Sequence, residues 1–490
     1  MVKKIKSFLF ENKTTKQTIA KNTFWLTFGN IIGRLLRVGI VVYAARILGA
    51  EGWGLFSYAI GLIAFLTIFT DLGIRAVLTR EVAKDNNEEK TTRILSTSLF
   101  IEFALIAISA LVVIFIAPHL TALPGAKEIL LITLTVLVFD SLREFGFAVI
   151  RATEKMEWEA GIFILANLSI AVFGVIFLQI SPTVKSFTLA YSVGTGVGTV
   201  AVFYVLRGHL KKLVSSFSTK LIKPILSSGW PFAVSAMLGG LLINIDILII
   251  GFYRTATEVG FYSAALRPVQ LLYIIPSILA ISIFPAMSRL ANKAAEAVRS
   301  VLEQSITLVF LAAIPIALGG VVLGREIISL LFGSEFIPAT ASFQILIITI
   351  LVNFPAVILS DAIFAHDKQK ILIRFVAIAG VINVIFDFIL IPKFGIVGSA
   401  WTTLLAQAIG NIYLWHKTRQ INHFRVLRHL KKILLSSIIM TVAVWFMALL
   451  GFNVIINIIL SAIIYLGILA IMKESLISKI KSSLIAKITG

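Results

Sequence analysis

The sequence predicts an all-α polytopic membrane protein with about 14 transmembrane helices, and three observations predict this fold class. Hydrophobic residues form 58% of the 490-residue chain, and its mean hydropathy of +0.99 lies well above the range of soluble domains. Apolar runs of about twenty residues recur along almost the whole chain, and each can cross ~30 Å of hydrocarbon as a helix. Lys and Arg gather in alternate connections between these runs.

The predicted spans follow one another closely, at 23–45, 54–78, 94–116, 129–150, 160–180, 187–206, 225–252, 261–286, 302–323, 341–363, 371–391, 396–415, 433–451 and 454–472. If the N-terminus is cytoplasmic, 33 of the 44 Lys and Arg residues fall in cytoplasmic segments, with Arg374 counted at the cytoplasmic end of span 371–391, 6 in outside loops and 5 inside spans. Lys and Arg concentrate in cytoplasmic loops. This split therefore predicts an even number of spans in the cytoplasmic membrane, with both termini in the cytoplasm.

The formal net charge of +20 does not indicate a nucleic-acid partner, because the basic residues stand in short clusters between apolar runs. Cysteine is absent, which excludes disulfides, thiolate metal sites and a cysteine nucleophile. We predict no metal site and no cofactor. The first apolar run lacks a small-residue cleavage site, so we expect a retained helix rather than a signal peptide.

Two long cytoplasmic connections, 207–224 and 416–432, divide the spans into blocks of six, six and two. The predicted domains are therefore 1–224, 225–432 and 433–490. The first two blocks look like weak repeats, because the second span opens with GLFSYA at 54–59 and the eighth opens with GFYSAA at 260–265. An even number of helices keeps both repeats in one orientation, as in transporters built from parallel repeats.

Five short motifs occur in order along this frame. They are ARILG at 45–49 followed by GWGLF at 52–56, DLGI at 71–74, FPAMSR at 284–289, LFG at 331–333, and Asn383 followed by IPKFGIVGSA at 391–400. In these motifs the chain resembles the polysaccharide flippases of the multidrug/oligosaccharidyl-lipid/polysaccharide exporter superfamily, over about residues 20–430. The resemblance implies two six-helix lobes around a central cavity plus a C-terminal helix pair. It also implies alternating access that reorients an isoprenyl-diphosphate-linked oligosaccharide across the membrane.

Three arginines inside apolar spans are the predicted substrate-binding residues. Arg34 lies 13 residues after Lys21, about 20 Å along a helix and near the bilayer midplane, and Arg37 follows on the same face. Arg267 precedes Pro268 in the second lobe, and the resemblance implies cavity arginines on the first and eighth helices. A charge inside hydrocarbon costs ~2.5–3.5 kcal/mol or more. We expect these arginines to bind a diphosphate, with pairing to neighbouring acids, or snorkelling of Arg267, as the alternatives.

Acidic residues inside the spans are the predicted ion-coupling or gating residues. Asp71 and Arg75 stand four apart, a favourable spacing for a pair on one helix face, and this pair could lock an inner gate. A comparable cluster contains Asp140, Arg143 and Glu144. For both groups, a structural ion pair is the main alternative.

Two further acids inside the spans are not part of such a cluster of charged residues. Asp246 has no cation within four positions, and Asp387 lies near the outer end of the eleventh span. A carboxylate in a low dielectric can bind a proton or sodium and couple an ion gradient to transport. Pairing with an arginine across the lobes is the alternative for each.

The functional alternatives belong to three classes. A membrane enzyme would be expected to carry a sizeable polar loop with carboxylates or histidine, and the outside loops are short, so no enzyme is predicted. A cation-coupled multidrug exporter of the same superfamily would share the fold, but arginines inside the spans favour an anionic lipid-linked saccharide. A non-transporting scaffold of glycan assembly is the third possibility. The last two spans are expected either to guide a polyprenyl tail or to pack against the second lobe or mediate oligomer contacts.

Overall fold

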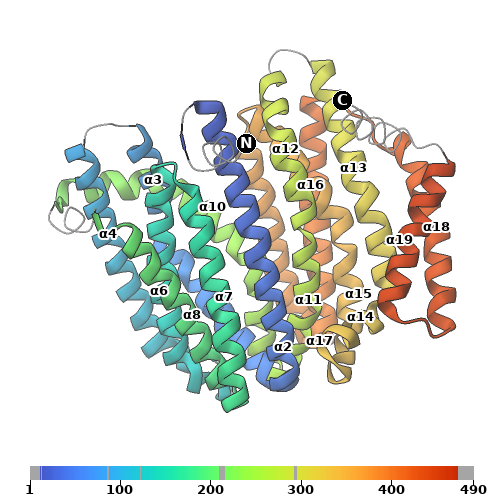
Figure 1. Cartoon of the computed structure of the whole chain (residues 1–490), viewed down its shortest axis with the longest axis horizontal. Helices are drawn as coiled ribbons and strands as arrows, with labels where there is room; N and C mark the ends of the chain where they lie inside the picture. Colours follow the sequence, from blue (N-terminus) through green and yellow to red (C-terminus); the bar gives the residue numbers. More distant parts are fainter. Residues whose placement is uncertain are drawn as a thin grey trace. The chain divides into compact units, whose positions relative to one another are not determined.

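The computed structural model describes residues 11–472 except 13, 85–87, 122, 209–215 and 292–294, and this part of the chain is helical throughout, without a strand. The elements appear in Figure 1. In chain order they are α2 (Thr15–Asp71), α3 (Ile74–Lys84), α4 (Glu88–Leu111), the π-helical η1 (Val112–Ile116), α5 (Ala117–Leu120), α6 (Pro124–Ala152), α7 (Met156–Ile180), α8 (Val184–Val205), α10 (Thr219–Tyr253), α11 (Ala256–Leu272), α12 (Ile274–Leu290), α13 (Ala295–Val322), α14 (Gly324–Phe332), the 3₁₀ turn η2 (Ser334–Ala339), α15 (Thr340–Ile348), α16 (Ile350–Ala365), α17 (Lys370–Ile421), α18 (Leu427–Leu449) and α19 (Val454–Ile471).

Among the described residues, 11 helical segments are long and apolar enough to cross a membrane. Two of them, α2 and α17, each contain a sharp kink and correspond to two predicted spans. Helix α6 matches the predicted span 129–150, although Asp140, Arg143 and Glu144 make it more polar than the others. The all-α membrane fold is thus confirmed, and the helices are compatible with 14 spans.

Glycine forms both kinks. Gly49 has φ 68° and ψ 179°, and Gly395 has φ 58° and ψ −140°. Glycine adopts positive φ readily because it has no Cβ. Each kink lies in a motif that carried the family resemblance, ARILG or IPKFG, so these motifs encode tight reversals between consecutive membrane helices.

The chain forms two compact units, unit 1 (Met1–Gly260) and unit 2 (Phe261–Gly490). Helix α10 packs against α2 and α3 inside unit 1. The approach is close where α3 begins, because a Cβ on Gly73 would lie 2.1 Å from the carbonyl oxygen of Gly229. The predicted domains are two six-helix lobes and a C-terminal helix pair, with boundaries at 224 and 432. This division into transport lobes stays a prediction.

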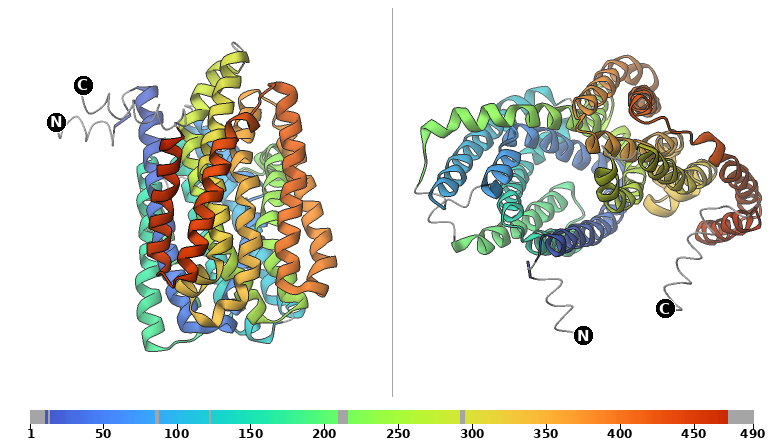
Figure 2. Two further views of the ribbon diagram at one scale, coloured as in Figure 1. Left: turned by 90° about the vertical axis from the view of Figure 1, so that its right-hand side faces the viewer. Right: turned by 90° about the horizontal axis from the view of Figure 1, so that it is seen from above.

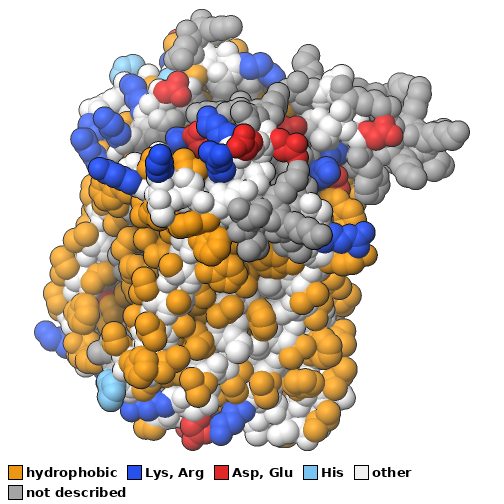
Figure 3. Space-filling view, turned by 90° about the vertical axis from the view of Figure 1, so that its left-hand side faces the viewer, with side chains coloured by type: hydrophobic (Ala, Val, Ile, Leu, Met, Phe, Trp, Pro, Cys, Tyr) orange, Lys and Arg blue, Asp and Glu red, His pale blue; other side chains and the backbone are white. Residues whose placement is uncertain are grey.

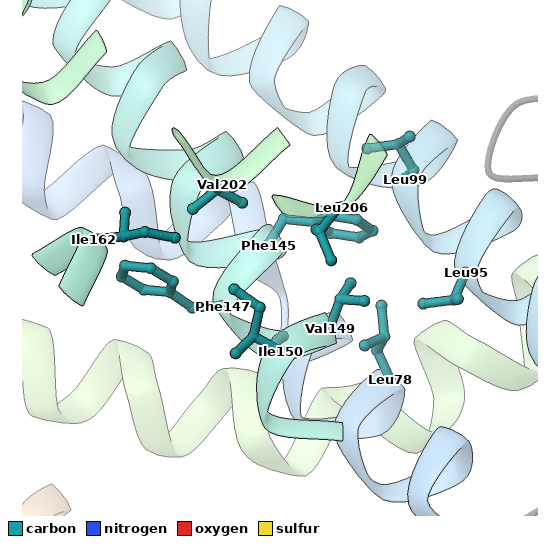
Figure 4. Close-up of a cluster of buried hydrophobic side chains, with 11 residues drawn as sticks. Leu78, Leu95, Leu99, Phe145, Phe147, Val149, Ile150, Ile162, Val202 and Leu206 are labelled. Atoms are coloured by element: carbon teal, nitrogen blue, oxygen red, sulfur yellow. The ribbon is translucent and has the colours of Figure 1, made fainter. Parts of the chain in front are cut away.

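An apolar core holds one end of unit 1 together. Figure 4 shows side chains from α3, α4, α6, α7 and the end of α8 meeting there. The cluster consists of Leu78, Leu95, Leu99, Phe145, Phe147, Ala148, Val149, Ile150, Ile162, Val202 and Leu206, each at most 5% exposed. Such packing gives neighbouring charged residues of α4 and α6, such as Glu102 and Arg143, a rigid environment of low dielectric constant.

Helices α18 and α19 form an antiparallel pair at the edge of unit 2, shown in red in Figures 1 and 2. Their inner faces pack against α13 and the start of α14, through Met440, Val444 and Leu469 among others. The Tyr465 hydroxyl donates a hydrogen bond to the Leu311 carbonyl oxygen at 2.8 Å. The packing alternative for this pair is therefore present in the structure, and it leaves the outer faces available to lipid.

The surface matches a bilayer. On the face in Figure 3, hydrophobic side chains cover a broad central band, and Lys and Arg gather at its two ends. Large apolar side chains such as Phe115, Leu131, Ile180 and Val200 are 64–77% exposed. Exposed apolar side chains at this density are stable only against hydrocarbon.

Candidate functional site

Arg34 and Arg37 lie on α2 without a carboxylate partner among the described residues. Arg34 is exposed and makes no hydrogen bond or ion pair with the described part of the chain. Arg37 is half-buried, and its Nε donates to Oδ1 of Asn167 on α7 at 2.9 Å. The same guanidinium lies 5.8 Å from the ring centroid of Tyr191 on α8, a cation–π distance.

Asn167 is itself fixed, which makes it a positioning group for Arg37. It is 1% exposed, and its Nδ2 donates to the Phe163 carbonyl oxygen at 2.7 Å. Its Oδ1 therefore points at Arg37 in a defined orientation. Because this bond uses only Nε, the terminal Nη groups of Arg37 can still present paired donors to an anion.

The opposite face of α2 is apolar. Side chains of α2, including Ile32, Leu36 and Ile40, line a groove of about 520 Å³ with Ala171 and Val175 of α7. Successive residues on a helix turn by 100°, so this stripe and the two arginines lie on different faces. Over the same turns, helix α2 thus has a basic face on one side and an apolar face on the other.

Arg267 lies on α11 in unit 2 and is half-buried. Its Nη1 donates to Oε1 of Gln270, one turn further along the helix, at 3.4 Å. Its predicted contact with the substrate, together with Arg34 and Arg37, stays a prediction.

Asp71 and Arg75 lie on two helices, whereas the sequence predicted that both lie on one helix face. Helix α2 ends at Asp71, Leu72 and Gly73 adopt positive φ, and Arg75 belongs to α3. Arg75 Nε still lies 3.7 Å from Oδ1 of Asp71, a long ion pair, and the same carboxylate oxygen also accepts from the Arg75 backbone nitrogen at 2.9 Å. Asp71 therefore caps the start of α3, because its carboxylate satisfies a free amide there.

Glu102 on α4 is the main partner of Arg75, and the sequence analysis missed it. The Nε of Arg75 donates to Oε1 of Glu102 at 3.2 Å, its Nη2 donates to the same oxygen, and Nη2 also reaches the Ser141 carbonyl oxygen at 3.2 Å. A signal was present, since Glu102 stands in the middle of the predicted span 94–116, where an acid is costly and usually functional.

The cluster expected on α6 is present as an ion-paired group. The Nη2 of Arg143 lies 2.8 Å from Oδ1 of Asp140 and 3.5 Å from Oε1 of Glu144. Arg143 is only 5% exposed, and its Nε and Nη1 have no hydrogen-bond partner among the described residues. The roles of Asp71, Arg75 and Asp140 in gating or ion coupling stay predictions.

Asp246 and Asp387 are both buried. Asp246 on α10 in unit 1 is 3% exposed, and Asp387 on α17 in unit 2 is fully buried. Asn383 precedes Asp387 by one turn, and Ser399 follows the Gly395 kink; both are buried, with side-chain oxygens that bond to no described residue. Buried amide, hydroxyl and carboxylate oxygens thus occur along α17, and oxygen is the donor atom that hard cations prefer.

Comparison with known proteins gives the family. A family described as "Polysaccharide biosynthesis protein" matches residues 19–291. The probable low-salt glycan biosynthesis flippase Agl15 of Haloferax volcanii is 25% identical over 406 residues, which cover 81% of this chain and 83% of that protein.

Solved structures share the fold. The lipid II flippase MurJ in an inward closed conformation matches with a TM-score of 0.74 and 20% identity, over 92% of this chain and 98% of that one. A multidrug resistance MATE family transporter in an inward-facing conformation matches with a TM-score of 0.62 and 15% identity, over 81% and 95%. These likenesses establish the fold, and the family match covers more than half of the sequence. The chain therefore belongs to the polysaccharide biosynthesis protein family.

Proposed function

We propose that this protein is a flippase that reorients an isoprenyl-diphosphate-linked oligosaccharide across the cytoplasmic membrane by alternating access. The observation that carries the proposal is the basic face of α2, where Arg34 and Arg37 have no carboxylate partner among the described residues. The similarity to the probable flippase Agl15 and to the lipid II flippase MurJ supports the same class of activity. It also favours a transporter over an enzyme.

The arginines suit a diphosphate for electrostatic and geometric reasons. A guanidinium stays charged at any physiological pH and presents paired donors that match two phosphate oxygens. Arg37 is oriented in advance by Asn167 and Tyr191, so little side-chain freedom is lost on binding. Arg267 is proposed as a further contact, made from unit 2.

The multidrug exporter is the second candidate, because a MATE family transporter shares the fold. Cationic drugs favour an acidic binding surface, whereas the α2 face is basic. The charge of this face therefore favours an anionic substrate.

Ion coupling is proposed for the buried acids of α10 and α17. Asp387 lies one turn after Asn383 on a kinked helix, and Asp246 is the buried acid of α10. Binding of a proton or sodium at such carboxylates would change the charge inside the membrane during the transport cycle. Asp71, Arg75 and Asp140 are proposed to hold the gate between cycles.

The helix pair α18–α19 is proposed to guide the polyprenyl tail along its lipid-facing side. Exposed residues of α18 include Trp445 and Phe446, and those of α19 include Ile459 and Ile463. A variant truncated at about residue 432 that inserts and folds stably should flip substrate more slowly than the full chain. An unchanged rate would leave the pair with a packing role alone.

Flipping of a fluorescent polyprenyl-diphosphate saccharide in proteoliposomes tests the main proposal. Arg34→Ala and Arg37→Ala should each lower the rate at least tenfold, since a hydrogen bond to a charged group contributes about 1.5–3 kcal/mol. Lys replacements should retain part of the rate, because charge survives while paired geometry is lost. Arg80→Ala is the control, as Arg80 pairs with Glu81 on the surface. Equal activity of the Ala variants and wild type would refute the ligand role, and export of cationic drugs instead would select the second candidate.

Orientation is tested separately. The proposed topology places both termini and the connections 207–224 and 416–432 in the cytoplasm. The chain has no cysteine, so single cysteines in these connections report without background. They should resist an impermeant thiol reagent in intact cells, and labelling of either one would contradict the topology.

A further inference from the structure

A network of acids and arginines lies in unit 1, and it does not include Arg34 or Arg37. It consists of Asp71, Arg75, Glu102, Asp140, Arg143 and Glu144, from α2, α3, α4 and α6. Four carboxylates share two guanidiniums, so the fully ionised network holds an excess of two negative charges. Excess charge at membrane depth is costly, and neutralisation by a bound cation or proton removes that cost.

Glu102 is the most enclosed member of the network. Its side chain is fully buried, and only Oε1 is engaged, by Arg75. Its second oxygen, Oε2, accepts no hydrogen bond from any described residue. One turn earlier on α4, Leu99 joins the apolar cluster of Figure 4, so an apolar surface lies directly beside this carboxylate.

We propose that Glu102 is a proton-binding site whose protonation releases Arg75 to Asp71. A proton from water forms an O–H bond at Oε2, the carboxylate becomes a neutral carboxylic acid, and no other bond is broken. Arg75 stays protonated throughout. Its guanidinium then exchanges the Glu102 oxygen for the Asp71 carboxylate, which already lies 3.7 Å from Nε.

Burial selects Glu102 among the four acids. Asp71, Asp140 and Glu144 have side chains that are 22%, 28% and 33% exposed, so water can solvate their charge. The Glu102 side chain has no exposed surface. Its partner Arg75 also pairs with Asp71, so the Arg75 guanidinium does not neutralise Glu102 alone. The carboxylate that water cannot reach is the one that gains most from becoming neutral.

The site fits a proton better than a metal cation. A sodium or magnesium ion needs several oxygen ligands around it, whereas Oε2 of Glu102 has no polar partner among the described residues. The guanidiniums of Arg75 and Arg143 also occupy the network and repel a second cation. A proton needs only one oxygen atom.

Charges on the other elements that pack against α4 do not change this assignment. On α3, Arg80 pairs with Glu81 at the surface. Glu88, Glu89, Lys90 and Arg93 of α4 itself lie in its exposed first turns. On α10, Lys220 and Lys223 are exposed, and Asp246 lies about 39 Å along the helix from Lys220. The groups in electrostatic range of Glu102 are Arg75, Asp71 and Glu144.

The proton would act at a break in the backbone. Leu72 and Gly73 have φ of 42° and 78°, and they separate Asp71 from the helix that carries Arg75. The Arg75–Glu102 pair ties α3 to α4, whereas an Arg75–Asp71 pair would tie α3 back to the end of α2. Proton uptake would thus exchange a contact between α3 and α4 for one across the α2–α3 break.

Infrared difference spectroscopy of the full-length protein in lipid nanodiscs tests the proposal without any substrate. The wild type should show the carbonyl stretch of a buried carboxylic acid at acidic pH, and this band should be lost at alkaline pH. Glu102→Gln should abolish that titrating band. The matched control is Glu159→Gln, because both Glu159 oxygens accept from Arg151 and its charge is paired one to one.

A second variant probes the shared guanidinium. Asp71→Asn leaves Arg75 to Glu102 alone, so the Glu102 band should be lost at a lower pH than in the wild type. This variant also decides the matter if Glu102→Gln fails to fold. The proposal is wrong if Glu102→Gln keeps the titrating band, if Asp71→Asn does not move its midpoint, or if sodium removes the band at constant pH.

Discussion

Two groups of arginines occur inside the apolar helices of unit 1, and their surroundings differ. Arg34 and Arg37 on α2 have neutral neighbours, the amide of Asn167 and the ring of Tyr191 beside Arg37. Arg75 and Arg143 are enclosed by carboxylates. We propose that the same residue type has two roles within one fold. The arginines without a carboxylate partner would attract an anionic ligand, and those enclosed by acids would hold helices together.

The largest difference between the two groups should appear in stability. Arg75→Ala leaves the buried Glu102 carboxylate without its cation, and removing one partner of a buried pair costs about 3–5 kcal/mol. Arg34→Ala removes an exposed side chain without a described partner, so its effect should stay within about 0.5 kcal/mol. Denaturant unfolding in detergent measures both. The cost for Arg75→Ala should be greater at alkaline pH, where Glu102 cannot become neutral.

The opposite results for Arg34→Ala and Arg75→Ala would each have a definite meaning. If Arg34→Ala destabilises the protein as much as Arg75→Ala, Arg34 has a structural partner and the ligand role of the α2 face loses its basis. If neither variant is destabilised, the buried network is not an important source of stability.

Transport activity should depend on Asn167 because this residue orients Arg37. Asn167→Ala removes the acceptor that orients Arg37, without removing the charge, so flipping should fall about tenfold and an added cost in folding should stay near 1 kcal/mol. Asn411→Ala is a matched control, since Asn411 is a buried asparagine whose Nδ2 also donates to a carbonyl oxygen four residues earlier. Equal losses of activity in both variants would show that Asn167 acts through general packing.

Sequence patterns predicted the fold well, because the length and polarity of each apolar run are local properties. The reversals at Gly49 and Gly395 fall between predicted spans for the same reason. The charged network was less predictable. Spacing predicted the Asp71–Arg75 pair, which is present at 3.7 Å, but it did not predict the helix break at Leu72 and Gly73 or the closer partner Glu102. Partners 27 positions apart on two helices are set by tertiary packing, which periodicity does not encode.

The proposed binding residues were partly predictable. An arginine in an apolar span is conspicuous in any sequence, and Arg34 and Arg37 were found in this way. Asn167 and Tyr191 carry no such mark, since a polar residue of this kind in a membrane helix is common at helix contacts. Only the packing of α7 and α8 against α2 identifies them as neighbours of Arg37.

The smallest effect should come from an exposed ion pair on unit 1. Lys185 Nζ lies 2.8 Å from Oε2 of Glu128, and their side chains are 57% and 63% exposed. The hydrogen bond from Lys185 lowers the pKa of Glu128 below its ordinary value. A lowered pKa means that the contribution of the pair to stability is present above the ordinary pKa of glutamic acid, ~4.3, and is lost as the pH falls through the folded-state value.

Glu128→Gln should therefore change the thermal midpoint only slightly at neutral pH, and not at all at low pH or in high salt, where the exposed charges are screened. Glu159→Gln is the comparison, because that carboxylate is only 8% exposed and is bound by Arg151 through both oxygens. It should lower the midpoint more, since burial removes the water that would otherwise solvate each charge. If Glu128→Gln lowered the midpoint as much as Glu159→Gln, burial would not be what separates the strong ion pairs of this protein from the weak ones, and the contrast between Arg75 and Arg34 would need another cause.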